Sequence, residues 1–265
     1  MKRADYPAQE PLSEAGEAYG AECWRRGEGI DGEESGYGPD PYQRLLVFKP
    51  ERPTGPVLLF WHGGGWTSGY KEWMAFMAPA FTTAGITFVS AGYRLAPGHL
   101  FPAGIGDCRA ALDWVHANIG SDVFIGGHSS GGHYAAMLAA QGGASRVRGC
   151  LPLSGVFEFG EGSGLSMRPR FLGPNPDNDR LASPRLALEA PLPPFLVACG
   201  SKDFAHLIPQ AQRFVQAVLA AGGAAELLLM EGRTHFTASY AGGEPDGPWM
   251  PAALAFIREH GGSRA

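Results

Sequence analysis

The most informative short motif is Gly-His-Ser-Ser-Gly at residues 127–131. It follows an apolar run and precedes an alanine-rich segment, so we expect a tight turn from a strand into a helix. Such a turn leaves no room for side chains at its flanking positions, and it exposes the central one, Ser129. Ser130 cannot be central, because His128 would then stand where glycine is required. The motif therefore predicts that Ser129 is a nucleophile.

A second motif, His-Gly-Gly-Gly-Trp at residues 62–66, directly follows the apolar run Val-Leu-Leu-Phe-Trp. Consecutive glycines let backbone N–H groups approach an oxygen that becomes negative during acyl transfer, and one such donor contributes roughly 3–4 kcal/mol. We assign the N–H groups of Gly64, Gly65 and Ser130 as this oxyanion hole. His62 is expected to shape the loop through hydrogen bonds rather than to act as a base.

A nucleophilic serine needs a general base, and the base needs a group that orients it. Where a sheet carries this kind of turn, the order along the chain is serine, acid, histidine. His235 follows the apolar run at 225–232, which is where the base is expected. Asp203 follows the run at 194–200, which is where the acid is expected. The less favoured candidates for these two roles are Glu231, His206 and His260.

The three predicted groups define a reaction. His235 would take the Ser129 proton as the serine oxygen attacks a carbonyl carbon, and Asp203 would hold the imidazole in the required tautomer. This chemistry requires no metal or organic cofactor. The side chains expected to contact substrate are Trp66, His133, Phe204 and Phe236. His133 follows the serine by one helical turn, so its alternative role is packing in the pocket wall.

Seven apolar runs bounded by glycine or proline are typical of strands buried on both faces. Helical patterns alternate with most of them, which favours a mostly parallel sheet covered by helices on both faces, in an α/β fold. The expected strands are 43–49, 57–62, 86–93, 122–128, 148–155, 194–200 and 225–232, and the expected helices are 71–85, 104–120, 130–141, 208–223 and 251–262.

The 265 residues are consistent with one α/β domain, 1–265. Two stretches lack regular strand or helix patterns. Residues 1–41 form a polar N-terminal arm, which either is flexible or folds over a pocket mouth as part of a cap. Residues 156–193 have no strand pattern but are too apolar for a solvated linker, so we interpret them as a small cap insertion.

Composition excludes several classes of partner. With 21 basic and 26 acidic residues the net charge is −5, and no run of lysine and arginine is present. Nucleic acid and anionic membrane surfaces are therefore not expected as partners. The four cysteines are widely spaced, which suggests neither disulfides nor a zinc site. No apolar N-terminal stretch resembles a signal peptide, so a cytoplasmic setting is expected.

Several motifs in order resemble the hormone-sensitive-lipase-like branch of the α/β-hydrolase fold. They are HGGGW, YRLAP at residues 93–97, FPAGIGD at 101–107, GHSSGG, and the loops that carry Asp203 and His235. The resemblance extends from about residue 42 to 260 and implies an α/β-hydrolase fold with carboxylesterase activity. It also implies that Arg94 makes an ion pair behind the site and that Asp107 caps a helix.

The turn motif departs from that branch, in which the usual sequence is G-D-S-A-G-G. Here His128 and Ser130 replace aspartate and alanine. GHSSGGH is more similar to the kynurenine formamidase (arylformamidase) group, which also has a short cap and a Ser-Gly-Val segment like that at 154–156. Its oxyanion loop, however, has tyrosine or phenylalanine where this chain has Gly65, as the esterases do.

Three functions follow from these patterns. The leading hypothesis is a serine hydrolase that cleaves small carboxylic esters with short acyl or aryl groups. The alternative is an arylformamidase that cleaves a formyl amide such as N-formylkynurenine. A non-catalytic ligand-binding module on the same fold is disfavoured, because such proteins typically lose a triad member. In each case the expected partner is a small molecule, and the sequence leaves a homodimer open.

Overall fold

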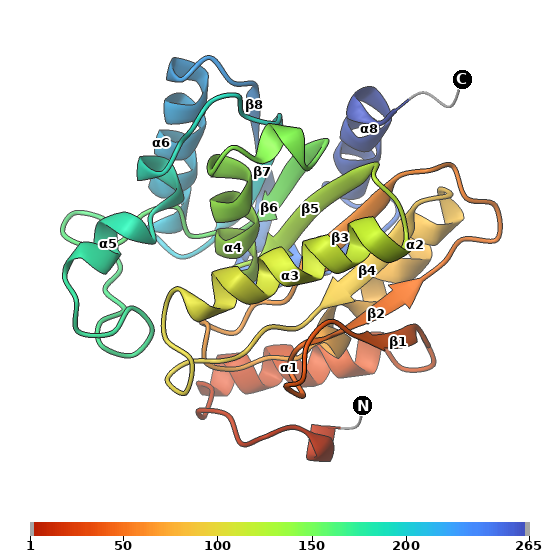
Figure 1. Ribbon diagram of the computed structural model, residues 1–265, viewed down its shortest axis with the longest axis horizontal. Coiled ribbons are helices and arrows are strands. Elements are labelled where there is room, and N and C mark those ends of the chain that lie inside the picture. The colour runs from red at the N-terminus through yellow and green to blue at the C-terminus, as the bar shows by residue number, and fades with distance from the viewer. Residues whose placement is uncertain (1–2, 263–265) are drawn as a thin grey trace.

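The computed structural model describes residues 3–262, which form an eight-stranded sheet with helices on both faces (Figure 1). The strand order is β1-β2-β4-β3-β5-β6-β7-β8. The β1-β2 and β2-β4 pairs are antiparallel and the other five pairs are parallel. The predicted mostly parallel α/β architecture is therefore confirmed. The strands are β1 (Glu33–Gly36), β2 (Arg44–Phe48), β3 (Val57–Trp61), β4 (Thr87–Ala91), β5 (Val123–His128), β6 (Gly149–Leu153), β7 (Phe195–Lys202) and β8 (Ala225–Thr234).

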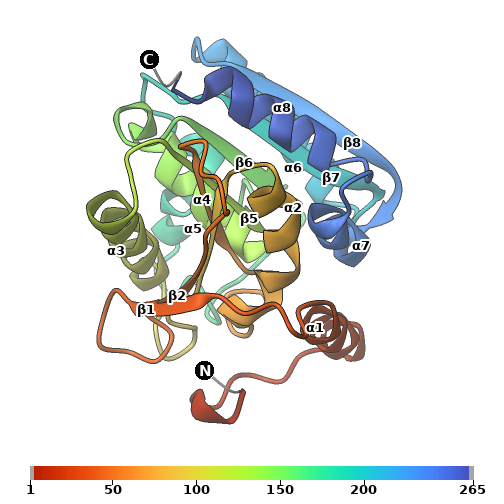
Figure 2. The same cartoon turned by 90° about the vertical axis from the view of Figure 1, so that its right-hand side faces the viewer.

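Helices pack against both faces of the sheet and form a separate apolar core on each face. One core joins α3, α4 and α6 to the sheet face that carries Leu59 and Ile125. The other joins α1, α2 and α8 to the face that carries Leu58 and Phe124, and Figure 2 shows α3 and α8 on opposite sides. Adjacent residues alternate between the cores because side chains of a strand alternate between faces. The helices are α1 (Glu14–Arg26), α2 (Ala78–Thr83), α3 (Ala103–Asn118), α4 (Ser130–Ala140), α5 (Asp177–Leu181), α6 (Leu207–Ala220), α7 (His235–Tyr240) and α8 (Met250–His260), with short 3₁₀ segments at Arg3–Asp5, Lys71–Met77, Gly143–Ser145, Pro184–Leu186 and Ala241–Gly243.

Strand register brings the two glycine motifs together. The central strands β3 to β6 are buried at every residue. In the parallel β3-β5 pair, Trp61 lies opposite Gly127. The chain leaves β3 directly into the His-Gly-Gly-Gly loop, and it leaves β5 directly into the Ser129 turn. Both motifs therefore lie at the same edge of the sheet, as parallel strands require.

The N-terminal arm is ordered in the structure. It contributes α1 and the edge strand β1, which pairs with β2. Sequence periodicity gave no sign of β1, because its four residues are polar or small and none is buried. Ser13 caps α1 by accepting a hydrogen bond from the N–H of Gly16, which is the standard N-cap arrangement. The arm thus packs α1 against the 3₁₀ segment Lys71–Met77.

The segment between β6 and β7 lies beside the sheet at the left of Figure 1 and contains α5. Its Phe157, Phe159 and Phe171 are buried in the core that α4 shares. These buried aromatic side chains anchor the irregular segment to the core.

Two details behind the site were expected from the motifs. Arg94 does pair with Asp107, through Nη2 to Oδ1 at 2.7 Å. The predicted helix-capping role of Asp107 is wrong, however. Asp107 lies inside α3, after its first turn, and accepts hydrogen bonds from Arg94 and from Gln43.

Within residues 3–262, no helix has the length and apolar character needed to cross a membrane.

Candidate active site

The turn between β5 and α4 holds Ser129 in a strained conformation. Its φ of 55° and ψ of −117° lie outside the regions that residues with a side chain usually adopt. A Cβ atom on Gly127 would lie 2.3 Å from the carbonyl carbon of Gly131. One on Gly131 would lie 2.2 Å from the carbonyl oxygen of Trp61. Gly127 is therefore required for the turn itself to close, and Gly131 is required for it to pack against the neighbouring strand β3.

Ser129, His235 and Asp203 form a continuous hydrogen-bonded chain. The distance from His235 Nε2 to Ser129 Oγ is 3.0 Å, and that from His235 Nδ1 to Asp203 Oδ1 is 2.7 Å. The three residues come from different elements: the start of α4, the start of α7 and the end of β7. This is the geometry in which a histidine can accept the serine proton while a carboxylate fixes its orientation.

Asp203 is held as a carboxylate by its hydrogen bonds. Burial raises the pKa of Asp203, but hydrogen bonds from His235, Ser154 and the N–H of Phe204 outweigh burial and lower it below its ordinary value. Ser154 donates from Oγ to Asp203 Oδ2 at 2.5 Å, and Phe204 N–H donates to Oδ1 at 2.8 Å. The negative charge therefore remains available to stabilise an imidazolium on His235.

The glycine loop after β3 passes directly over Ser129. A Cβ atom on Gly63 would lie 3.1 Å from Cβ of Ser129. Gly64 has φ of 123°, which favours glycine, and a Cβ there would lie 2.0 Å from the carbonyl oxygen of Ser68. Gly65 has φ of 63°, with open space around a Cβ. The loop therefore brings its backbone close to the nucleophile, as oxyanion donors require.

Ser130 begins α4, where backbone N–H groups have no partner within the helix. Its side chain is buried and lies 3.1 Å from the hydroxyl of Tyr93. That hydroxyl also donates to the carbonyl oxygen of His62 at 3.0 Å. Tyr93 thus links the oxyanion loop to the start of α4. His62 stacks on the Tyr93 ring and does not contact Ser129, in a loop-shaping position.

Positive φ angles concentrate at this site. Among the described residues, the non-glycine residues with positive φ are Trp66, Ser129 and Ser154. Trp66 ends the oxyanion loop, Ser129 is the candidate nucleophile, and Ser154 holds Asp203. Strained backbone at functional positions persists only where the surrounding structure enforces it. The strain therefore supports the same site that the side-chain geometry defines.

A cavity of about 290 Å³ opens onto Ser129 and His235. Phe204 and Phe236 line it, as expected for substrate contacts. Phe204 is 48% exposed and stacks on the His235 ring, with centroids 4.3 Å apart. The N-terminal arm and the segment between β6 and β7 also contribute to the lining, through Pro11, Leu12, Ser13, Gly16, Tyr19 and Arg170.

The other two expected substrate contacts, Trp66 and His133, lie behind the oxyanion loop instead of lining this cavity. Trp66 Nε1 donates to His133 Nδ1 at 3.1 Å, and His133 Nε2 donates to the carbonyl oxygen of Ala182 at 2.7 Å. Both side chains are buried, and Trp66 stacks on Phe171 of the segment between β6 and β7. Their position is that of a packed wall that joins the glycine loop to this segment.

The less favoured acid and base candidates do not join the hydrogen bonds that connect Ser129, His235 and Asp203. Glu231 is exposed on β8, the edge strand. His260 ends α8 and contacts Phe256. His206 packs its ring near Phe204. The geometry therefore favours the three residues already identified.

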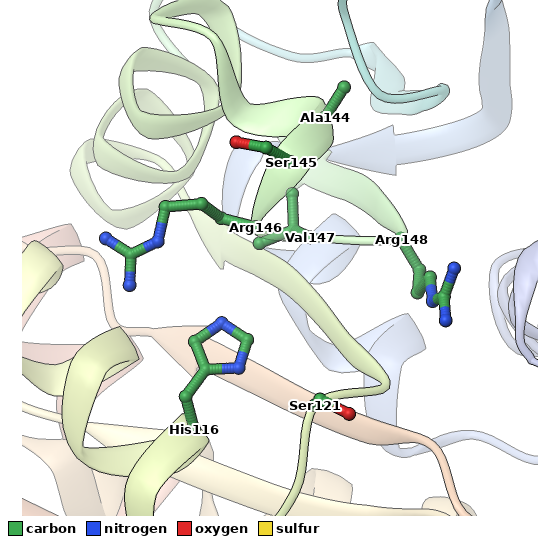
Figure 3. Close-up of a pocket in the computed structure, with 7 residues that line it drawn as sticks. All are labelled: His116, Ser121, Ala144, Ser145, Arg146, Val147 and Arg148. Carbon is green, nitrogen blue, oxygen red and sulfur yellow. The ribbon is translucent and has the colours of Figure 1, made fainter.

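A second hollow lies away from this site, beside the start of β5 and β6 (Figure 3). His116, Ser121 and two arginines line it. Arg146 pairs with Asp113, and Arg148 pairs with Asp122 at 3.0 Å. Each guanidinium thus has a carboxylate partner, and the hollow offers no nucleophile held by a base.

Comparison with known proteins decides the family. A model of the alpha/beta hydrolase fold matches residues 58–239, more than half of the chain and a range that includes Ser129, Asp203 and His235. The chain belongs to the α/β-hydrolase family. Its esterase relatives agree with the hormone-sensitive-lipase-like group that the motifs indicated.

This α/β hydrolase is similar to esterase LipC of Mycobacterium tuberculosis, with 30% identity over 215 residues, or 68% of this chain and 53% of that protein. It is 26% identical over 234 residues to the isoprenylcysteine alpha-carbonyl methylesterase ICME of Arabidopsis thaliana, covering 75% of this chain and 55% of that protein. The chain thus spans about half the length of these curated relatives.

Solved structures resemble the fold over most of its length. Thermogutta terrifontis esterase 2 has a TM-score of 0.74 at 23% identity, covering 86% of this chain and 94% of the other. A truncated carbohydrate esterase from gut microbiota has a TM-score of 0.75 at 19% identity, covering 88% and 98%. At these identities the likeness establishes the shared α/β-hydrolase fold.

Several site residues of this α/β hydrolase were not predicted from sequence. Ser154 supports Asp203, and its Ser-Gly-Val segment was noted only as part of a resemblance. Tyr19 and Leu12 line the cavity from the arm, and Arg170 lines it from the segment between β6 and β7. No spacing rule links such distant positions to residue 129. Folding over a pocket mouth was one of the two roles expected for the arm, but the sequence did not identify the residues involved.

Proposed function

We propose that this chain is a serine hydrolase that cleaves small carboxylic esters through an acyl-enzyme on Ser129. The observation that carries the proposal is the hydrogen-bonded chain from Ser129 through His235 to Asp203, with distances of 3.0 and 2.7 Å. The adjacent glycine loop supplies the backbone N–H groups of Gly64 and Gly65. Relatives named as esterases support the same class of reaction.

The proposed reaction has two halves. In the first, Ser129 Oγ bonds to the ester carbonyl carbon while its proton passes to His235 Nε2. The tetrahedral oxyanion is held by the N–H groups of the oxyanion loop and of Ser130. The carbon–oxygen bond to the alcohol then breaks, and the alcohol leaves with the proton from His235. In the second half, water repeats the attack and the acid leaves.

Cavity size supports a small substrate. A volume of about 290 Å³ is at the lower end of ordinary ligand pockets. Phe204, Phe236 and Leu12 supply apolar surface around the reacting groups. A short acyl group or an aryl ring fits this lining better than a long lipid chain.

We also propose a reducing, cytoplasmic setting, which agrees with four cysteines that are buried and unpaired.

The first test compares kcat/KM for p-nitrophenyl butyrate and for N-formylkynurenine, with Ser129→Ala as the blank. We expect the ester to be the better substrate. Loss of the serine should lower kcat by about 10⁴- to 10⁶-fold, which leaves the residual contribution of the oxyanion hole. Ester hydrolysis no faster than in the blank would contradict the proposal.

The alternative function is hydrolysis of an aryl formamide, and one observation favours it. Arg170 lines the cavity, and N-formylkynurenine carries a carboxylate that a guanidinium could bind. Arg170 already pairs with Glu10 of the arm, so the ester remains the first proposal. A formamide preferred tenfold or more over the ester would reverse this order.

A non-catalytic binding role is distinguished by a fluorophosphonate probe. Such probes label only a serine that its neighbours have activated. We expect labelling at Ser129 and none in the Ser129→Ala variant. An unlabelled wild-type protein would favour the binding module.

A further inference from the structure

His128 lies next to His235 and has no role in the reaction proposed above. The two ring centroids are 4.8 Å apart, and His128 is 1% exposed. Its Nε2 lies 3.0 Å from the backbone carbonyl oxygen of His235. A carbonyl oxygen only accepts hydrogen bonds, so the proton must be on Nε2 of His128. Its Nδ1 is then an acceptor.

Tyr19 supplies the donor that this acceptor needs. Its hydroxyl lies 3.2 Å from His128 Nδ1 and 2.9 Å from Ser239 Oγ. These contacts form a directed chain in which Ser239 donates to Tyr19, Tyr19 donates to His128, and His128 donates to the main chain of His235. These hydrogen bonds begin at Ser239 and end at His235, and both residues lie in α7. They therefore fix α7 at its first residue and again one turn later.

The hydrogen-bonded side chains of Ser239, Tyr19 and His128 carry no net charge. Burial, together with the neighbouring His235, lowers the pKa of His128 to about 3. Burial also raises the pKa of Tyr19 well above its ordinary value. Both groups are therefore neutral at neutral pH. A neutral ring beside His235 adds no repulsion when that imidazole becomes positively charged during acyl transfer.

We propose that His128 and Tyr19 are positioning residues for His235. His128 holds the His235 backbone so that Nε2 of the base reaches Ser129, and Tyr19 fixes the His128 tautomer that makes this hydrogen bond. This inference rests on the proposed function, because it assigns a role in the same reaction. It also makes α1, which carries Tyr19, part of the catalytic unit.

The proposal gives a role to His128, the residue at which the turn motif departs from the esterase branch. In the esterase branch that the motifs resemble, the position of His128 is usually aspartate. An ionised carboxylate cannot donate to the carbonyl oxygen of His235, and burying it there would be unfavourable. In this chain His128→Asp should therefore impair the reaction, whereas His128→Gln retains an N–H donor of similar reach.

The experiment measures kcat and KM for p-nitrophenyl butyrate in Tyr19→Phe, His128→Leu and His128→Gln. Tyr19→Phe removes the neutral hydrogen bonds to His128 and to Ser239, and it should lower kcat about 3- to 10-fold, with KM unchanged within about twofold. His128→Leu should lower kcat by about 100-fold. His128→Gln should recover at least about tenfold of that loss. A purely structural role would not give this split or this rescue.

Tyr240→Phe is the matched control, because Tyr240 stacks on Tyr19 in the same aromatic cluster and has no place in the chain of donors. It should keep the wild-type kcat. NMR of the histidine ring nitrogens gives a second reading that needs no substrate. We expect His128 protonated at Nε2 in the wild type and a mixture of tautomers in Tyr19→Phe.

The outcomes separate the two proposals. Wild-type kcat in both Tyr19→Phe and His128→Leu, or an unchanged tautomer in Tyr19→Phe, would overturn the positioning role while leaving the esterase intact. A wild type no faster than Ser129→Ala would overturn the proposed function and this inference together.

Discussion

At the scale of the residue, the electrostatics of the site depend mainly on the carboxylate of Asp203. Its side chain is fully buried beside His235, where an unpaired carboxylate would be strongly unfavourable. Donors from three different places offset that cost: the His235 ring, the Ser154 hydroxyl and the Phe204 N–H. The resulting low pKa keeps the charge next to the ring that must become positive.

Replacing Asp203 with asparagine tests this reasoning. The amide retains the shape of the side chain but stabilises the wrong imidazole tautomer of His235, so kcat should fall about 10⁴-fold. Ser154→Ala, the matched control, removes one donor and leaves the charge, so about a tenfold loss is expected. Steady-state kinetics on p-nitrophenyl butyrate measure both. An Asp203→Asn enzyme near wild-type activity would mean that another residue orients the base.

At the scale of the element, the oxyanion loop depends on backbone geometry that its glycines make available. The loop folds back on itself, because the N–H of Ser68 donates to the carbonyl oxygen of Gly64 at 3.0 Å. The arm then fixes the return of the loop. Gln9 donates to the carbonyl oxygen of Gly69 and accepts from its N–H, each at 2.9 Å. The element is therefore held on both sides where it passes Ser129, whose Cβ would lie 3.1 Å from a Cβ on Gly63.

Two neighbouring glycines should respond differently to alanine. At Gly64 the new Cβ would collide with Ser68, so the loop must move and kcat should fall about 10²- to 10³-fold. At Gly65 the space is open and only the left-handed conformation is unfavourable, which costs about 1–2 kcal/mol. We expect Gly65→Ala to stay within about tenfold of wild-type kcat. Equal losses in both variants would argue against this account of the loop.

At the scale of the whole molecule, three histidines are buried without charge. Burial lowers the pKa of His62 and His133 to about 4 and that of His128 to about 3, from an ordinary value of 6.5. The unfolded chain therefore binds protons below pH 6.5 that the folded chain does not. The free energy of unfolding falls as the pH decreases from about 7 toward 4.

The size of this dependence can be predicted. Between about pH 7.5 and 5.5, each such histidine should lower the free energy of unfolding by about 1.4 kcal/mol. In His133→Gln the side chain cannot titrate, so the difference between the two pH values should be smaller by that amount. Urea unfolding of both proteins at the two pH values measures it. The same pH dependence in both would mean that His133 is protonated in the folded state.

The sequence by itself determined the local chemistry of this protein. The apolar runs located seven strands. Burial on both faces explains the continuous apolar residues of the inner strands, but that expectation is wrong for β8, an edge strand in which only Met230 is buried. The glycines around Ser129 and before Trp66 identified two turns that only small residues permit. The order of serine, acid and histidine along the chain came from the fold that the turn indicated, and the parallel sheet brings the three loops to one edge. Local sterics and periodicity account for the turns and the strands.

Tertiary structure alone decided which distant residues serve the site. Trp66 and His133 were expected at the substrate but pack behind the loop, because their polar atoms satisfy each other and Ala182. Tyr19 reaches His128 across 109 positions of sequence, from a helix in a segment with weak patterning. Such contacts depend on how α1 packs against the sheet and α7. That packing arises from the sum of many apolar contacts, which no short stretch of sequence encodes.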